Sequence, residues 1–181
     1  MRLFIAVPLP DEARDLLCSL QDELRSKVKR AAWVPRHDMH VTVRFLGQTE
    51  EDLVPEIHEM LSDALAEHPT FEAVLKRGGA FPNPRRPNVF WVGLEDGARF
   101  AGLAHTANLA LSALGFPAPD KPFRPHATLC RLRGPWLGGL PKRLEDLGVL
   151  GRFQVDRLVL YESKLNSAGA QHAALHTYLL K

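Results

Sequence analysis

The heptapeptide HVTVRFL at residues 40–46 recurs in similar form as HATLCRL at residues 126–132. Each copy places a His and a Thr two positions apart in a run of strand-forming residues. Residues i and i+2 of a β-strand point to the same face. Each copy therefore presents an imidazole and a hydroxyl side by side, with its apolar neighbours turned the other way. One copy lies in each half of the chain, which predicts a protein built from two similar halves.

The two pairs, His40 with Thr42 and His126 with Thr128, define the candidate site. If the halves bring the pairs face to face, they form a small cleft with two proton carriers and two neutral hydrogen-bonding groups. Imidazole titrates at about pH 6.5, so one ring can be protonated while the other is not. Such a pair suits displacement at phosphorus, in which one His takes a proton and the other delivers one. A single His/Thr pair arises easily by chance, so the inference depends on the two copies together.

The composition predicts one globular domain spanning residues 1–181. Hydrophobic residues make up 45% of the chain and charged residues 24%, and the formal net charge is +2. The two cysteines, Cys18 and Cys130, form no CxxC pair and no disulfide framework. No apolar run approaches the roughly 20 residues that cross a bilayer, and the N-terminal run is too short for a secretion signal. We therefore expect a cytoplasmic protein without a membrane partner.

Hydrophobic periodicity predicts three helices and seven strands, alternating in an order that resembles one half used twice. The predicted strands cover residues 3–7, 40–47, 71–75, 88–94, 126–132, 152–163 and 172–181, and the predicted helices 11–28, 49–67 and 98–114. Residues 78–87 contain two Gly and three Pro, which predicts a loop. The expected fold is α+β and bilobal, with two pseudo-symmetric lobes of mainly antiparallel sheet. Helices should lie on the outside, and the His/Thr strands should meet in a central cleft.

Other chemistries find little support in the sequence. His172 and His176 are four positions apart, but neither they nor His37 and His40 form an HExxH helix, and no thiolates stand at zinc spacing. No glycine-rich loop carries the P-loop Lys-Ser/Thr. No local signature of a Ser or Cys nucleophile is present either. We expect no metal and no cofactor. The remaining histidines are expected on the surface: His37, His58, His68, His105, His172 and His176.

Two arginines near the repeats are weaker candidates. Strict alternation turns Arg131 away from His126, so either a bulge re-aims it or it is a structural arginine. Arg44 shares the face of His40 by alternation, which allows either a phosphate contact or a solvated strand end.

Three aromatic residues are candidates for stacking on a nucleobase. Phe123, in the loop before His126, is the best of them. Phe45 and Trp91 lie in strand patterns, where aromatic residues belong more often to the core.

Basic residues come in three clusters, which permits a polyanionic partner without requiring one. The clusters are Arg25, Lys27, Lys29 and Arg30; Arg85 and Arg86; and Arg131, Arg133, Lys142 and Arg143. A solvated surface is the alternative for each cluster. The Arg85–Arg86 pair could follow a nucleic-acid backbone or belong to a plain loop.

Several segments together resemble the 2H phosphoesterases. They are RLFIAV at residues 2–7, the strand 40–47, FRPHATLCR at residues 123–131, and YESKL at residues 161–165 followed by Gly169. The resemblance is closest to the bacterial and archaeal RNA 2′,3′-cyclic phosphodiesterases, also described as 2′-5′ RNA ligases. It implies a bilobal α+β fold without a metal, and hydrolysis of a terminal RNA 2′,3′-cyclic phosphate to a 2′-phosphate.

The resemblance also implies roles for the site residues. His40 becomes the proton donor to the leaving 3′ oxygen and His126 the base that activates water. Thr42 and Thr128 hold the phosphate, and Arg131 matches a basic position of the family. Where the family often has an aromatic residue near the last hairpin turn, this chain has AQH at residues 170–172.

The implied partners are RNA with cyclic phosphate ends or small cyclic nucleotides, with no obligate protein partner. Two alternatives stay open. One is a ligase that joins the cyclic phosphate to a 5′-hydroxyl, and the other is a non-catalytic RNA-binding module.

Overall fold

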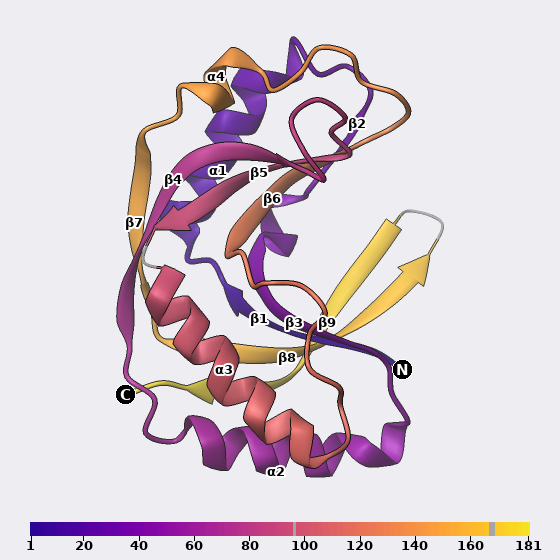
Figure 1. The fold of residues 1–181 in the computed structure, drawn as a ribbon, viewed down its shortest axis with the longest axis vertical. Coiled ribbons are helices and arrows are strands. Elements are labelled where there is room, and N and C mark those ends of the chain that lie inside the picture. The colour runs from indigo at the N-terminus through magenta and orange to yellow at the C-terminus, as the bar shows by residue number, and fades with distance from the viewer. Residues whose placement is uncertain (96, 167–168) are drawn as a thin grey trace.

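One nine-stranded sheet organises the fold, and the two His/Thr strands lie at its centre. The computed structural model describes residues 1–95, 97–166 and 169–181. The sheet runs in the order β7-β4-β5-β6-β3-β1-β8-β9, with β2 paired to β6, and its pairings are antiparallel. The strands are β1 (Arg2–Pro8), β2 (Ala31–Trp33), β3 (His40–Gln48), β4 (Phe71–Phe81), β5 (Val89–Glu95), β6 (His126–Leu132), β7 (Val149–Val155), β8 (Arg157–Asn166) and β9 (Gly169–Leu179). The sheet curls strongly (Figure 1), and the predicted α+β class is confirmed.

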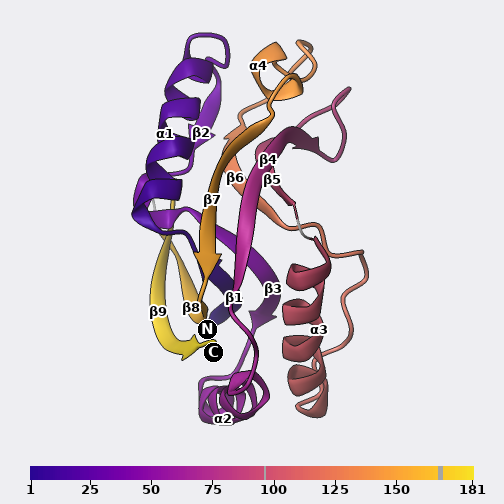
Figure 2. The ribbon, with the colours of Figure 1, turned by 90° about the vertical axis from the view of Figure 1, so that its left-hand side faces the viewer.

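The helices lie at the periphery of the sheet, as predicted (Figure 2). They are α1 (Asp11–Arg25), α2 (Val54–Leu65), α3 (Gly97–Ala113) and α4 (Lys142–Glu145), with short 3-10 turns η1 (Arg36–Asp38) and η2 (Glu51–Leu53). We call α1, α4, β2 and β4–β7 the upper lobe, and α2, α3, β1, β3, β8 and β9 the lower lobe, as they stand in Figure 1. Within the described part of the chain, no helix is long and apolar enough to cross a bilayer.

The two halves of the chain are pseudo-symmetric and exchange a strand. In the first half β1, α1 and β3 follow one another, and in the second half β5, α3 and β6 do the same. A later strand of each half pairs within the other lobe, because β4 follows β3 but pairs with β5, and β8, the second strand after β6, pairs with β1. Neither half of the chain therefore completes a lobe by itself.

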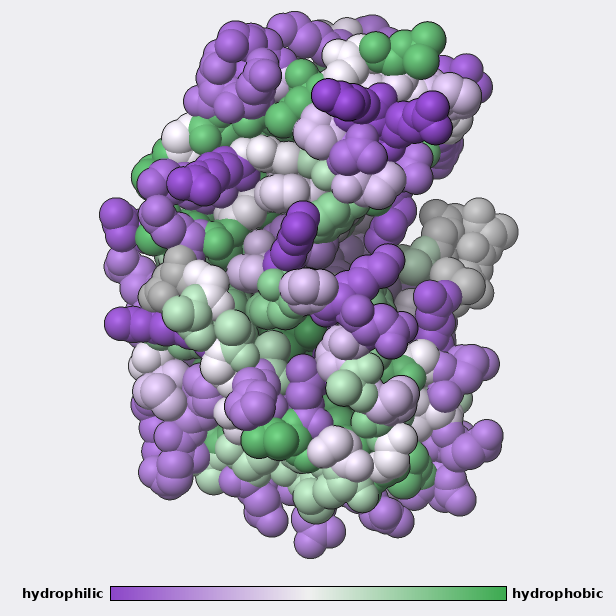
Figure 3. Space-filling model, in the orientation of Figure 1, coloured by the Kyte–Doolittle hydropathy of each residue, from purple (hydrophilic) through white to green (hydrophobic). Residues whose placement is uncertain are grey.

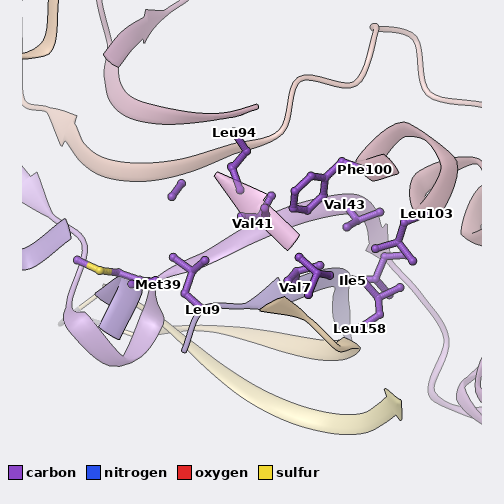
Figure 4. Packing of buried hydrophobic residues seen from close by; sticks show 14 of the residues in the cluster. Ile5, Val7, Leu9, Met39, Val41, Val43, Leu94, Phe100, Leu103 and Leu158 are labelled. Atoms are coloured by element: carbon purple, nitrogen blue, oxygen red, sulfur yellow. The ribbon is translucent and has the colours of Figure 1, made fainter. Parts of the chain in front are cut away.

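The hydrophobic core lies between the sheet and the helices. Alternate residues of β1 and β3 point into it, and α3 covers them with Phe100 and Leu103, which are both fully buried. Figure 4 shows this packing around Ile5, Val7, Val41, Val43 and Leu158. Burial of such apolar side chains stabilises the fold by roughly 1.5–3 kcal/mol each. It also makes β3 rigid on the side opposite its His and Thr.

The predicted loop over residues 78–87 begins too early. β4 continues through Gly78 and Gly79 to Phe81, paired with β5. Pairing with β5 keeps these residues in the strand, and their close neighbours explain why both positions are glycine. A Cβ on Gly79 would lie 2.2 Å from the Trp91 indole, and one on Gly78 would lie 2.5 Å from the Leu144 carbonyl oxygen.

The single strand predicted over residues 152–163 is also wrong. The chain forms β7 up to Val155 and β8 from Arg157, and the two strands lie in different lobes. β7 pairs with β4 at one end of the sheet, whereas β8 pairs with β1 and β9. Apolar residues recur on both sides of Asp156, so periodicity could not locate the crossing between lobes. The hairpin predicted at Asn166–Gly169 is present as the pairing of these two residues, and its turn lies outside the described residues.

Candidate active site

The two His/Thr pairs are brought together by the contact between β3 and β6. Val41 is the register partner of Ala127, and both are buried on the core side, with exposures of 0% and 1%. In an antiparallel pair this register sets His40 opposite Thr128 and Thr42 opposite His126. Directly opposed residues have Cβ atoms about 4.5–5.5 Å apart. The four side chains, all partly buried, therefore form one compact patch on the other face of the sheet.

Both imidazoles are anchored in the same way. Nδ1 of His40 lies 2.6 Å from the carbonyl oxygen of Asp38, and Nδ1 of His126 lies 2.7 Å from that of Arg124. A carbonyl oxygen only accepts, so each Nδ1 carries a hydrogen and donates it to the residue two positions earlier. In the neutral ring this leaves the lone pair on Nε2, the atom that can take up a proton.

Thr42 completes the first pair by a direct contact. Its Oγ1 lies 3.1 Å from Nε2 of His40, so the hydroxyl donates to the ring when the imidazole is neutral. When the imidazole is protonated, the same hydroxyl is released to donate elsewhere. Because Thr is β-branched, its side chain holds this position with little rotational freedom.

Burial makes both histidines weak bases. The pKa of His40 is lowered to about 4, mainly by burial, which together with smaller contributions from the nearby His172 and His126 outweighs the opposing effect of the Asp38 carbonyl. Burial also lowers the pKa of His126, to which the positive charge of Arg131 contributes. At neutral pH both rings are neutral. An anionic group bound between them would raise both pKa values, so an anion and a proton would bind together.

A β-bulge in each His/Thr strand decides which side chains join the site. In β3, Thr42 and Arg44 pair with two consecutive residues of β1, so Val43 between them is left without a partner. In β6, Thr128 and Cys130 pair with two consecutive residues of β5, so Leu129 is left without a partner. An extra residue in one strand reverses the faces of all residues that follow it. The same sequence position is bulged in both repeats, which extends the pseudo-symmetry of the halves.

The bulge in β6 resolves the two possibilities for Arg131. This residue is exposed and lies close enough to His126 for its charge to lower the pKa of that ring. The alternation that would turn Arg131 away is broken by the skipped Leu129. The side chain is therefore available beside the His/Thr patch.

The bulge in β3 has the opposite consequence for Arg44, and the predicted place of Arg44 on the His40 face is wrong. Arg44 is only 8% exposed and turns toward α3. It donates to Oδ1 of Asn108 at 2.5 Å and to the carbonyl oxygen of Pro117. Arg44 thus ties β3 to α3 and to the loop that leads to β6.

Aromatic rings flank both histidines. Next to His40, Phe4 has its ring centroid 5.2 Å away and stacks on Tyr161 at 5.1 Å. Next to His126, Phe81 lies edge-on with centroids 4.8 Å apart, and Trp91 lies at 6.1 Å. These rings supply the low-polarity surroundings that depress both pKa values.

The other aromatic residues differ in how well their observed positions match the predicted ones. Phe45 is 64% exposed rather than buried in the core, because the bulge turns it to the face of Phe4. Trp91 is only partly buried and stands outside the core cluster, next to His126. Phe123 is partly buried and packs against the core. Its role as a stacking residue stays a prediction.

His172 belongs to the site, although the sequence suggested an ordinary surface histidine. Its ring centroid on β9 lies 5.5 Å from that of His40 and 4.9 Å from that of Phe4. Its Nδ1 is buried and has no hydrogen-bond partner within the described chain. No spacing rule could have found it, because β9 reaches His40 only through the order β3-β1-β8-β9 of the sheet.

Comparison with known proteins gives a consistent result. Residues 7–91 match the model of the LigT-like phosphoesterase family. The chain is 30% identical over 184 residues to an RNA 2′,3′-cyclic phosphodiesterase of Methanothermobacter thermautotrophicus, with 99% of each chain covered. It is 33% identical to one from Thermus thermophilus, covering 100% of this chain and 91% of the relative. A crystal structure of the Thermus thermophilus protein TT0787 is similar with a TM-score of 0.87 and 31% identity, covering 99% of this chain and 98% of that one.

Proposed function

Because the chain belongs to the LigT-like phosphoesterase family, we propose that it hydrolyses the 2′,3′-cyclic phosphate at the end of an RNA. The product would be a 2′-phosphomonoester with a free 3′-hydroxyl. The observation that carries the proposal is the shared anchoring of His40 and His126, which leaves two equivalent Nε2 atoms on one patch. The full-length relatives named RNA 2′,3′-cyclic phosphodiesterase support the choice of substrate.

In the proposed reaction His126 acts as the base. Its Nε2 takes a proton from water as the water oxygen attacks phosphorus. The bond between phosphorus and the 3′ oxygen breaks, and the 3′ oxygen receives a proton from Nε2 of His40. Acid and base catalysis of this kind each contribute typically 10²- to 10⁴-fold in rate. Because the two rings are anchored in the same way through Nδ1, this assignment of acid and base rests on the family resemblance.

The cyclic phosphate itself supplies the charge that the acid requires. Its negative charge raises the pKa of His40 from about 4 and favours the protonated ring. Once the ring is protonated, Thr42 no longer donates to Nε2 and can donate to a phosphate oxygen instead. Thr128 and Arg131 stand beside His126 for the same task, where negative charge builds in the transition state.

The alternative of RNA ligation uses the same site. A 5′-hydroxyl replaces water as the attacking group, and the product is a 2′-5′ bond. RNA with a cyclic phosphate end is incubated with and without an RNA that carries a 5′-hydroxyl. We expect the 2′-phosphate product in both, and a dominant joined product would overturn the hydrolase proposal.

The alternative of non-catalytic RNA binding is tested by chemistry rather than affinity. We expect hydrolysis with a bell-shaped dependence on pH that EDTA does not change. Binding of RNA without any turnover would contradict the proposal, and a rate abolished by EDTA would argue for a metal mechanism.

The continuous sheet and the exchanged strands support residues 1–181 acting as one catalytic unit. The cytoplasmic location also stays a prediction.

A further inference from the structure

Basic residues from three separate parts of the chain gather at one end of the upper lobe. The parts are the connection between α1 and β2, the loop between β4 and β5, and the segment that follows β6, all of which lie in the upper lobe (Figure 1). The cations they carry are Lys27, Lys29, Arg30, Arg85, Arg86 and Arg133. We call this set the basic end.

Backbone hydrogen bonds join the three parts. The amide of Arg133 donates to the carbonyl of Arg30 at 2.8 Å, and the amide of Leu132 donates to the carbonyl of Asn88 at 2.9 Å. The Arg85–Arg86 turn is itself held by Oδ1 of Asn83, which accepts from both backbone amides. The basic end therefore results from sheet pairing around β6 and has a defined shape.

This end of the molecule has few negative charges in its sequence. Residues 25–37, 82–94 and 121–144 contain no Asp or Glu. The acidic residues that precede the corner on α1 are already paired, Asp22 with Arg25 and Glu23 with Arg143. Most other long cations of the described chain, such as Arg36, Lys76 and Arg152, form ion pairs.

The cations of the basic end are exposed, and within the described residues none of the six forms an ion pair. Four of them line a pocket of about 190 Å³ together with Trp136: Lys27, Lys29, Arg30 and Arg133. In the space-filling view, strongly hydrophilic and hydrophobic atoms alternate over the upper lobe (Figure 3). Unpaired cations of one sign around a pocket repel each other, and a polyanion would relieve that repulsion.

The basic end continues directly from the catalytic patch along β6. This strand carries His126 and Thr128 first, then Arg131, and the chain reaches Arg133 just beyond its end. At about 3.3 Å per residue the distance from His126 to Arg133 is roughly 23 Å. A bound phosphodiester chain could follow this path from the histidines to the pocket.

We propose that the basic end binds the sugar-phosphate backbone of single-stranded RNA on the 5′ side of its cyclic phosphate. The inference rests on the proposed function. Binding of RNA at the basic end makes the enzyme selective for oligonucleotides over mononucleotides. Contacts to phosphates position a strand without reading its sequence, so the selectivity concerns length and not bases. Trp136 in the pocket wall offers a ring on which a base can stack.

The test compares two substrates in three proteins. The substrates are 2′,3′-cyclic AMP and an RNA octamer that ends in a 2′,3′-cyclic phosphate. The proteins are the wild type, the double variant Arg30→Glu/Arg133→Glu, and the control Arg2→Glu, which changes an exposed cation in the lower lobe with no ion pair among the described residues.

For the double variant we expect kcat/KM on the octamer to fall at least tenfold, while kcat/KM on cyclic AMP changes less than twofold. The slope of log kcat/KM against log salt for the octamer should become shallower by about 1.4, because each lost phosphate contact on a single strand contributes about 0.7. The control should match the wild type. A wild type without preference for the octamer, or an equal loss on both substrates, would overturn the inference.

A binding measurement separates this inference from the proposed function. Fluorescence polarisation is recorded with a labelled RNA octamer that ends in a 3′-hydroxyl. Loss of RNA binding in the double variant supports the role of the basic end, whether or not the wild type hydrolyses either substrate. If the wild type hydrolyses neither substrate, the proposed function is contradicted and the RNA-binding inference is not. Binding equal in wild type and double variant, or tighter binding of duplex than of single strand, contradicts the inference.

Discussion

Val41 on β3 lies directly opposite Ala127 on β6, and this one pairing joins the two halves of the chain at the site. Both side chains are small and buried, so the strands approach closely on the core side. On the other face the same register brings each His next to the Thr of the other repeat.

The two imidazoles should be separately essential. His40→Ala and His126→Ala are each expected to lower kcat/KM on 2′,3′-cyclic AMP by about 10²- to 10⁴-fold, since each removes one proton carrier. His105→Ala serves as the control, because His105 is exposed on α3. Wild-type rates in either active-site variant would contradict the two-histidine mechanism.

Arg44 and Arg131 should respond in opposite ways to the same substitution. Arg44→Met removes the buried bonds to Asn108 and Pro117, and we expect the free energy of unfolding in urea to fall by about 1–3 kcal/mol. Arg131→Met should leave stability within about 0.5 kcal/mol, as surface changes usually do. It should lower kcat/KM by about 10- to 100-fold, because a charged hydrogen bond contributes about 1.5–3 kcal/mol. A loss of activity without a loss of stability in Arg44→Met, or a loss of stability in Arg131→Met, would contradict the placement of Arg44 in the interior and of Arg131 beside the site.

His172 should control the pKa of His40. Protonated His172 repels a proton on His40 and lowers its pKa. His172→Phe keeps an aromatic ring against Phe4 but removes this charge, so we expect the pKa of His40 to rise. An NMR titration of the His40 ring measures the change, with His105→Phe as control. An unchanged or lower pKa would remove His172 from the site.

Acid should destabilise the protein through His40. The folded-state pKa is about 4, whereas an unfolded His titrates at about 6.5, so between these values the unfolded chain binds more protons. Stability therefore falls as the pH drops from 6.5 to 4, and this ring contributes at most about 3 kcal/mol to the loss. Urea unfolding of His40→Gln should show a smaller difference between pH 7 and pH 4.5 than the wild type. A difference as large as that of the control His105→Gln would exclude His40 as the cause.

Much of the fold could be predicted because its signals are local. The strand and helix periods placed β1, α1, β3 and α3 close to their observed bounds, and the repeated His/Thr spacing identified four residues of the candidate site. The errors arose where a neighbour decides the outcome. Gly79 lies in a strand because it pairs with Trp91 on β5, and Asp156 lies between two strands because β7 and β8 pair in different lobes.

The sequence by itself determined that each repeat places its His and Thr on one face of a strand, since alternation along a strand depends only on positions two apart. Only the tertiary structure decided which other side chains join them. The bulges at Val43 and Leu129 turned Arg44 into the core and Arg131 out to the site, and sheet order brought His172 to His40. The physical reason is that register and strand order are set by pairing between distant segments, which no local pattern encodes.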